Sequence, residues 1–252
     1  MTLTQGSIRK TFTRLWLPMI GGIFAVKAID LSDAYFIGLL GEEPLAAIGF
    51  TFPILMTLVS LSIGLSAGAS SVLSRAIGEG AEIQTRQSIV LGAVCMAFIA
   101  SLVIALTGYF FIERILAAMG AKKGVLQAAT DYMRVWFMGI GLLIIPVMIH
   151  GMLRATGDSK TPAIMMTATA LLNIALNPVF IFGFHFIPAL GVQGAAVGTV
   201  IARMPLIIIA IYLLWERQLC VLSVVHFKNG IKKWGKILRI AAPASLSTSL
   251  NP

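Results

Sequence analysis

The sequence contains few charged residues for its length. Only 12% of its 252 residues are charged, 58% belong to the hydrophobic set, and the mean hydropathy is +0.93. Soluble domains carry roughly 25% charged residues, so this chain lacks the polar side chains that a water-facing surface requires. The composition therefore excludes a soluble enzyme and a disordered tail, and it indicates a membrane protein.

Cysteine is also scarce. The two cysteines, Cys95 and Cys220, have no nearby Cys or His at the spacing of a zinc or redox site, so we predict no metal site, disulfide or bound cofactor. The net charge of +9 would suit a nucleic-acid partner, but the basic residues stand between apolar runs and not along one face of a domain. We therefore expect no nucleic-acid partner and interpret these residues as topology signals.

Long runs without charge define the expected membrane spans. A spanning helix needs roughly 20 apolar residues. Six helices are predicted, over residues 15–40, 44–74, 87–112, 135–153, 161–184 and 193–215. The last two come from one charge-free stretch, which the Gly- and Pro-containing segment 183–191 divides as a turn. The predicted fold class is thus an all-α integral membrane bundle of six transmembrane helices.

Basic residues in short loops favour the cytoplasmic side of a membrane. With the N-terminus inside, thirteen basic residues lie in inner segments: Arg9, Lys10, Arg14, Arg75, Arg86, Arg154, Lys160, Arg217, Lys228, Lys232, Lys233, Lys236 and Arg239. Four lie in outer segments: Arg114, Lys122, Lys123 and Arg134. This asymmetry predicts a multi-pass protein of the cytoplasmic (inner) membrane with a cytoplasmic N-terminus.

The end of the sequence resembles its beginning. After the sixth helix, the basic stretch 228–239 has the pattern of an amphipathic segment on the inner membrane surface. The apolar run that follows opens with RIAAP (239–243), which resembles RLWLP (14–18) at an offset of 243 − 18 = 225 residues. Six spans return the chain to its starting side, as a parallel repeat requires. We predict a six-helix lobe over residues 1–227, and a basic linker with the truncated start of a second lobe and seventh helix over 228–252.

Four polar residues are predicted to lie at one depth in the membrane. An intramembrane acid costs about 2.5–3.5 kcal/mol, so Asp33 should face a cavity or a partner. Asp33 and Asn177 each lie seven residues from the outer end of their helices, and Thr199 lies six residues from its own. Asn173 shares a helical face with Asn177. These residues could line one pocket, although Asn and Thr also form hydrogen bonds that hold membrane helices together.

Three further charges accompany this group. Lys27 and Asp30 follow the i,i+3 spacing, so they can pair and leave Asp33 as the titratable acid. Arg203 can instead pair with either acid, and the sequence does not choose between these arrangements.

A serine-hydrolase motif occurs by chance. Residues 64–68 (GLSAG) match G-x-S-x-G, but the strand-turn-helix context of that motif is absent. The small residues in 64–71 and 194–198 more simply permit close helix packing. We therefore do not expect an enzyme.

Several segments together resemble the multidrug and toxic compound extrusion (MATE) family of cation-coupled antiporters, in its DinF-like branch. They are LSDAYFIGLLG (31–41), LAAIG (45–49), RATGDSKTP (154–162), NIALNPVFIFG (173–183) and GVQGAA (191–196). The similarity covers essentially the whole chain as the N-terminal lobe of that family. It implies two six-helix lobes around a central cavity, of which this chain is one.

The resemblance also implies a function and a site. It implies export of organic, often cationic or amphipathic compounds, driven by inward flow of H⁺ or Na⁺, with ion coupling at Asp33, Asn173, Asn177 and Thr199. Tyr132 matches a tyrosine implicated in this branch, and Asp30, Lys27 and Arg203 are further candidates for the cavity. Many members of the branch carry an aspartate where this chain has Asn177.

Two alternatives to drug export remain open. One is a flippase for lipid-linked precursors from the same superfamily, and the other is a non-transporting membrane scaffold or half-transporter. A single lobe closes a cavity only against a partner. Besides a small organic substrate and membrane lipid, the expected partner is therefore the second lobe or another copy of this chain.

Overall fold

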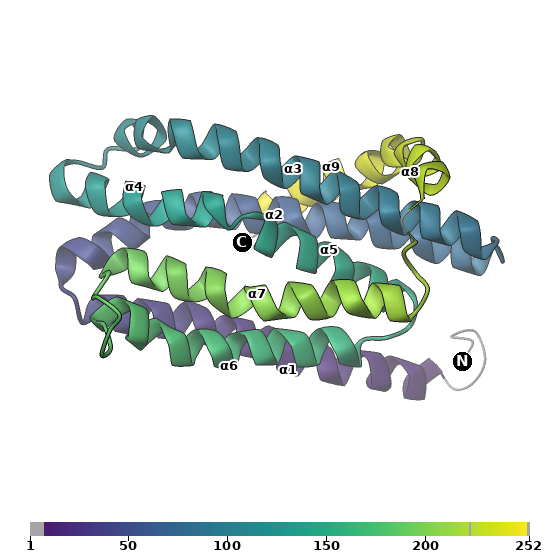
Figure 1. Cartoon of the computed structure of the whole chain (residues 1–252), viewed down its shortest axis with the longest axis horizontal. Helices are drawn as coiled ribbons and strands as arrows, with labels where there is room; N and C mark the ends of the chain where they lie inside the picture. The colour runs from purple at the N-terminus through teal and green to yellow at the C-terminus, as the bar shows by residue number, and fades with distance from the viewer. Residues whose placement is uncertain (1–7, 222, 251–252) are drawn as a thin grey trace.

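The computed structural model describes residues 8–221 and 223–250, whose regular secondary structure is helical (Figure 1). The helices in chain order are α1 (Ile8–Gly38), α2 (Glu42–Gly78), α3 (Ile83–Ala118), α4 (Lys123–Met138), α5 (Gly141–Ala155), α6 (Lys160–Phe182), α7 (Val192–Glu216), α8 (Val224–Ile231) and α9 (Trp234–Leu250). The long helices run side by side along one direction. This arrangement confirms the predicted all-α bundle.

Among the described helices, α2, α3, α6 and α7 are long and apolar enough to cross a membrane, and α4 with α5 adds a fifth span if the pair is counted as one. Helix α1 has 31 residues, about 46 Å at 1.5 Å per residue, which exceeds the roughly 30 Å hydrocarbon core. It differs from the other spans because Lys27, Asp30 and Asp33 lie within it. These six elements correspond to the six predicted spans.

The fourth span differs from its prediction over residues 135–153. It begins at Lys123 and is broken into α4 and α5, which are bent by 49° relative to each other. The prediction included only charge-free residues, and it therefore began this span too late, because Asp131 and Arg134 lie inside α4. Arg134, which was assigned to an outer loop, is therefore a helix residue, and it pairs with Glu113 of α3 at 3.2 Å.

Helix α5 forms the centre of the bundle and contacts α2, α3, α6 and α7. Its side chains Ile144, Met148, Ile149, Met152 and Leu153 are fully buried. In contrast, α3 exposes a row of large apolar side chains, which suits a surface that faces lipid: Phe98, Leu102, Val103, Leu106 and Phe110.

The predicted small-residue stripe in α2 packs against α9. A Cβ atom on Gly64 would lie 2.8 Å from the Ala241 carbonyl oxygen, and one on Gly68 would lie 2.5 Å from that of Ile237. Any side chain at these positions would force the two backbones apart. Close packing is therefore confirmed, and the structure identifies its partner as the helix that follows the basic linker.

Two connections bear on the predicted boundaries. The turn between α6 and α7 falls within residues 183–191 as predicted, and Gly183 adopts a φ of +82°, which favours glycine. The basic stretch 228–239, in contrast, is not one amphipathic helix. It contains the end of α8, a turn and the start of α9, because a helix break falls between Ile231 and Trp234.

Candidate functional site

The three charged residues of α1 divide into an ion pair and a separate acid. Lys27 Nζ lies 3.0 Å from Asp30 Oδ2, and both side chains are exposed. Asp33, one turn further along α1, is partly buried and turns toward α6, where it meets Asn177. The structure thus selects the Lys27–Asp30 pair from the arrangements that the sequence left open.

Asp33 lies at one end of a chain of hydrogen bonds that links α1, α6 and α7. Asn177 Nδ2 donates to Asp33 Oδ1 and also, at 3.1 Å, to Asn173 Oδ1. Asn173 Nδ2 donates to Thr199 Oγ1 at 2.7 Å, and Thr199 Oγ1 donates to the Ala195 carbonyl at 2.9 Å. The two asparagines and Thr199 are buried. The structure therefore brings together the four residues predicted at one depth, while their role in ion coupling stays a prediction.

Glycines of α7 allow these helices to approach so closely. A Cβ atom on Gly194 would lie 2.2 Å from the Phe180 carbonyl oxygen of α6, and one on Gly198 would lie 2.7 Å from Asn177 Oδ1. Only glycine fits at either position without a displacement of α6. The segment GVQGAA therefore positions Thr199 against the two asparagines.

The hydrogen-bond chain has one unused acceptor. Asn177 Oδ1 is buried and has no hydrogen-bond partner among the described residues. The next residue is Pro178, which has no N–H to donate to the carbonyl of Ile174. An unsatisfied acceptor beside a carboxylate, at a weakened point of α6, is suited to receive a proton donor or a small cation.

Arg203 does not complete an ion pair with the two acids in this structure. Its guanidinium carbon lies 4.9 Å from the centre of the Trp136 ring, a cation–π arrangement. Tyr132 is buried one turn earlier on α4, with its ring centre 6.4 Å from that of Trp136.

Sequence reasoning missed Trp136, although a signal for it was present. Trp136 follows Tyr132 by four residues on α4, and Arg203 follows Thr199 by four residues on α7, so each lies on the same helical face as a candidate. This spacing marks Trp136 as a candidate beside Tyr132, whereas its contact with Arg203 is seen only in the structure.

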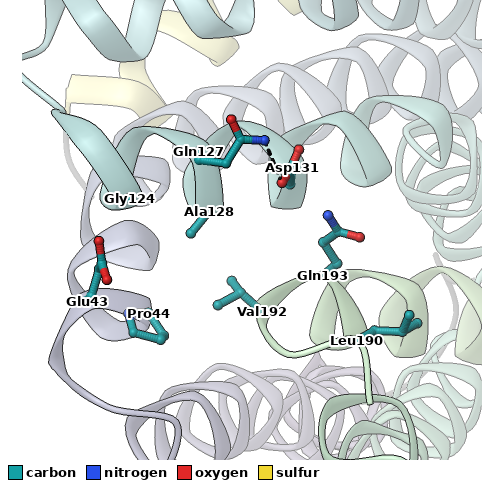
Figure 2. Close-up of a pocket in the computed structure, with 9 residues that line it drawn as sticks. All are labelled: Glu43, Pro44, Gly124, Gln127, Ala128, Asp131, Leu190, Val192 and Gln193. Atoms are coloured by element: carbon teal, nitrogen blue, oxygen red, sulfur yellow. Dashed lines mark hydrogen bonds between the residues drawn. The ribbon is translucent and has the colours of Figure 1, made fainter. Parts of the chain in front are cut away.

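A separate pocket lies at one end of the bundle (Figure 2). It has a volume of 320 Å³ and is formed by the start of α2, the first turns of α4 and the start of α7. Its polar lining residues are Glu43, Gln127, Asp131 and Gln193. Gln127 donates a hydrogen bond to Asp131, and the Glu43 carboxylate lies against Gly124 in the first turn of α4. None of the eight predicted site residues lines this pocket.

The segment RATGDSKTP forms a polar contact at the other end of α6 and α7. Asp158 Oδ1 accepts the Thr161 backbone N–H at 3.0 Å, and Asp158 Oδ2 accepts Arg217 Nη1 at 2.5 Å. Arg217 Nη2 also donates to Thr161 Oγ1 at 3.1 Å. Burial alone would raise the pKa of Asp158, but the hydrogen bonds from Thr161 and Arg217 outweigh it and hold that pKa below its ordinary value.

Proteins of similar sequence are transporters of about twice this length. The FAD transporter of Shewanella oneidensis is 34% identical over 251 residues, which are 99% of this chain and 55% of that protein. The multidrug export protein MepA of Staphylococcus aureus is 28% identical over 249 residues, 98% of this chain and 54% of MepA. The chain thus spans about half the length of the curated relatives it matches.

Solved structures of MATE transporters also match this chain over about half of their own length. A multidrug resistance MATE family transporter of the MOP superfamily in an outward-facing conformation superposes with a TM-score of 0.88 at 29% identity, covering 98% of this chain and 54% of that one. The bent form of the Vibrio cholerae MATE transporter VcmN superposes with a TM-score of 0.83 at 31% identity, covering 97% and 54%.

The family model named MatE matches residues 18–179, which include Asp33 and both asparagines of the hydrogen-bond chain. With this match, the helical bundle and the likeness to one half of MATE transporters, the chain belongs to the MatE family.

Proposed function

We propose that residues 1–252 form one lobe of a cation-coupled exporter of organic compounds, with Asp33 as the residue that takes up H⁺ or Na⁺. The observation that carries this proposal is the hydrogen-bond chain from Asp33 through Asn177 and Asn173 to Thr199. These hydrogen bonds connect one acid on α1 to two other membrane helices, α6 and α7. A change of charge at Asp33 therefore reaches the packing of α6 and α7.

Protonation of Asp33 changes the donors and acceptors that the hydrogen-bond chain contains. The carboxylate accepts a hydrogen from Asn177 Nδ2, whereas a carboxylic acid carries a hydrogen of its own to donate. Asn177 Oδ1 can accept it if the amide rotates, but rotation removes the donor that Asn173 Oδ1 now uses. Binding of a proton would thus shift the population between two arrangements of α1 and α6. Sodium would use the same oxygen atoms as ligands.

The membrane setting follows the basic asymmetry of the sequence. We propose a location in the cytoplasmic membrane, with the start of α1 on the cytoplasmic side. The 320 Å³ pocket at the start of α2, α4 and α7 would then open to the outside. The second lobe, or another copy of this lobe, would supply the opposite wall of the central cavity.

The multidrug relatives favour organic substrates, often cationic or amphipathic. The FAD transporter suggests a second candidate, because FAD is an anion with aromatic rings. Arg203 above Trp136, with Tyr132 alongside, combines a positive charge with aromatic surfaces. This group suits an anionic aromatic substrate better than a cationic one.

The proposal is tested in a two-lobed protein that contains this lobe, reconstituted in proteoliposomes under an H⁺ or Na⁺ gradient. Export of a cationic dye and of FAD should each be measured with wild type, Asp33→Asn and Asp30→Asn. We expect Asp33→Asn to abolish coupled export while the protein still inserts, because the amide keeps the shape of the acid but carries no charge.

The matched control is Asp30→Asn on the same helix, which removes an exposed, lysine-paired acid and should reduce export less. Wild-type export by Asp33→Asn under the same gradient would refute the coupling role. The relative rates for dye and FAD decide between the two substrate classes.

A further inference from the structure

Helix α8 turns an apolar face away from the bundle. Val224, Val225 and Ile231 are 71%, 64% and 39% exposed, and Lys228 lies on the same side of the helix. At 100° per residue, Val224, Val225 and Lys228 lie about 120–160° from Gly230, the buried residue of α8, and Ile231 lies about 100° from it at the edge of this outward face. An exposed apolar face on a short helix indicates a surface that is covered by something else.

Contacts with α3 fix this orientation. The backbones of α8 and α3 meet so closely that a Cβ atom on Gly230 would lie 2.5 Å from the Ser88 carbonyl oxygen. Just beyond α8, Trp234 Nε1 donates a hydrogen bond to the Gly92 carbonyl at 2.9 Å. Figure 1 shows α8 lying across α3 near the end of the bundle where α1 begins. The helix is therefore held against α3 by its glycine side.

The depth of α8 matches the boundary of a membrane. The charge-free run of α3 begins after Arg86, and Gly92 lies six residues further, about 9 Å along the helix axis. Amphipathic helices at a membrane surface bury their apolar face roughly 5–10 Å into the boundary between headgroups and acyl chains. The outward face of α8 thus lies at the level where lipid headgroups meet their chains.

The charge around α8 is of one sign. Lys228, Lys232, Lys236 and Arg239 are exposed, and the sequence contains no acidic residue from position 217 to 252. A cluster of basic residues beside an apolar helix face attracts anionic lipid headgroups and gains little from zwitterionic ones.

We propose that the outward face of α8, with the lysines around it, binds anionic phospholipid at this membrane surface. Val224, Val225 and Ile231 contact the upper acyl chains, while Lys228 and Lys232 contact the negative headgroups. Bound lipid would hold α8, and with it the start of α9, against α3. This proposal does not depend on which substrate or ion is transported.

The test uses the full chain with a fluorescent label on Val225→Cys, after Cys95→Ala and Cys220→Ser remove the native thiols. The protein is reconstituted in phosphatidylcholine vesicles in which one-fifth of the lipid is brominated phosphatidylglycerol or, separately, brominated phosphatidylcholine. Bromine quenches the label only on contact. We expect stronger quenching by phosphatidylglycerol, with a preference that falls at high salt.

The charge variant is Lys228→Gln with Lys232→Gln, and its matched control is Lys122→Gln with Lys123→Gln at the opposite end of the bundle. Each basic side chain near an anionic surface is worth about fivefold in affinity, so the charge variant should lose most of the preference and the control should keep it. Equal quenching by both lipids, or an unchanged preference in the charge variant, would overturn the proposal. Absence of quenching by either lipid would also overturn it, because protein and not lipid would then cover this face.

Discussion

The contact between Asp158 and Arg217 should stabilise the bundle by an amount that can be measured. It joins the turn before α6 to the end of α7, far from the Asp33 hydrogen-bond chain. Asp158 accepts hydrogen bonds from the backbone N–H and the hydroxyl of Thr161 at the start of α6, and it forms an ion pair with Arg217. Replacement of each partner in turn therefore separates the two contributions.

The expected magnitudes follow from exposure. Loss of a helix N-terminal capping bond typically costs about 1 kcal/mol. The ion pair is about one-third exposed on its Arg217 side, so screening limits it to about 0.5–1 kcal/mol. Asp158→Ala should thus cost about 1.5–2 kcal/mol, and Arg217→Gln only the ion-pair part. For a chain of this size these values lower Tm by about 3–8 °C and about 1–4 °C.

The pH dependence has a definite sign. Because the folded pKa of Asp158 is lowered, its contribution to the free energy of unfolding is fully present above the ordinary value of 3.8. It is lost as the pH falls below 3.8 through the folded pKa. The difference in Tm between wild type and Asp158→Asn should therefore stay constant near neutral pH and shrink only in strong acid.

The assay is thermal unfolding of the purified chain in detergent, with Lys160→Gln as an exposed neighbouring control. The double variant Asp158→Ala with Arg217→Gln should unfold only slightly below Asp158→Ala alone, because the ion pair is already absent and only the exposed hydrogen bond from Arg217 to Thr161 Oγ1 is left to lose. Fully additive losses in the double variant, or a Tm difference that begins to fall near pH 6, would refute the reasoning.

Two further predictions concern packing and topology. Gly194→Val should cost about 1–3 kcal/mol, because its Cβ would lie 2.2 Å from the Phe180 carbonyl oxygen. The same change at Gly21, which has open space around it, should leave Tm nearly unchanged, because Val and Gly differ little in helix propensity. A similar Tm loss in both variants would contradict the packing argument. A cysteine at Glu43 should react with an impermeant reagent from outside the cell and one at Gly80 only after permeabilisation, so external labelling at Gly80 would reverse the proposed orientation.

Charge and hydropathy along the chain were enough to predict the membrane class and most spans. An unpaired charge inside a membrane is costly, so runs without charge indicate most of the spans. The same rule failed where a charge has a partner. Arg134 lies within α4 and pairs with Glu113, and the prediction therefore placed the start of the fourth span too late.

Depth along each helix was likewise readable from the sequence. Counting residues from the helix ends placed Asp33, Asn177 and Thr199 at one level, and the hydrogen bonds between them agree with that level. The direction of those bonds was not readable. Neither was the position of Arg203, which lies over Trp136 although the sequence offered two acids as its partners.

For the small residues, too, the sequence predicted one property and only the structure showed the other. The sequence predicted that the small stripes of α2 and α7 would pack closely, because they lack bulk. It did not show that the first stripe meets α9 and the second meets α6. Hydropathy and depth concern one helix and its solvent, so they follow from the order of residues along the chain. The choice of partner depends on distances of 2–4 Å between helices far apart in sequence, and only the tertiary structure decides it.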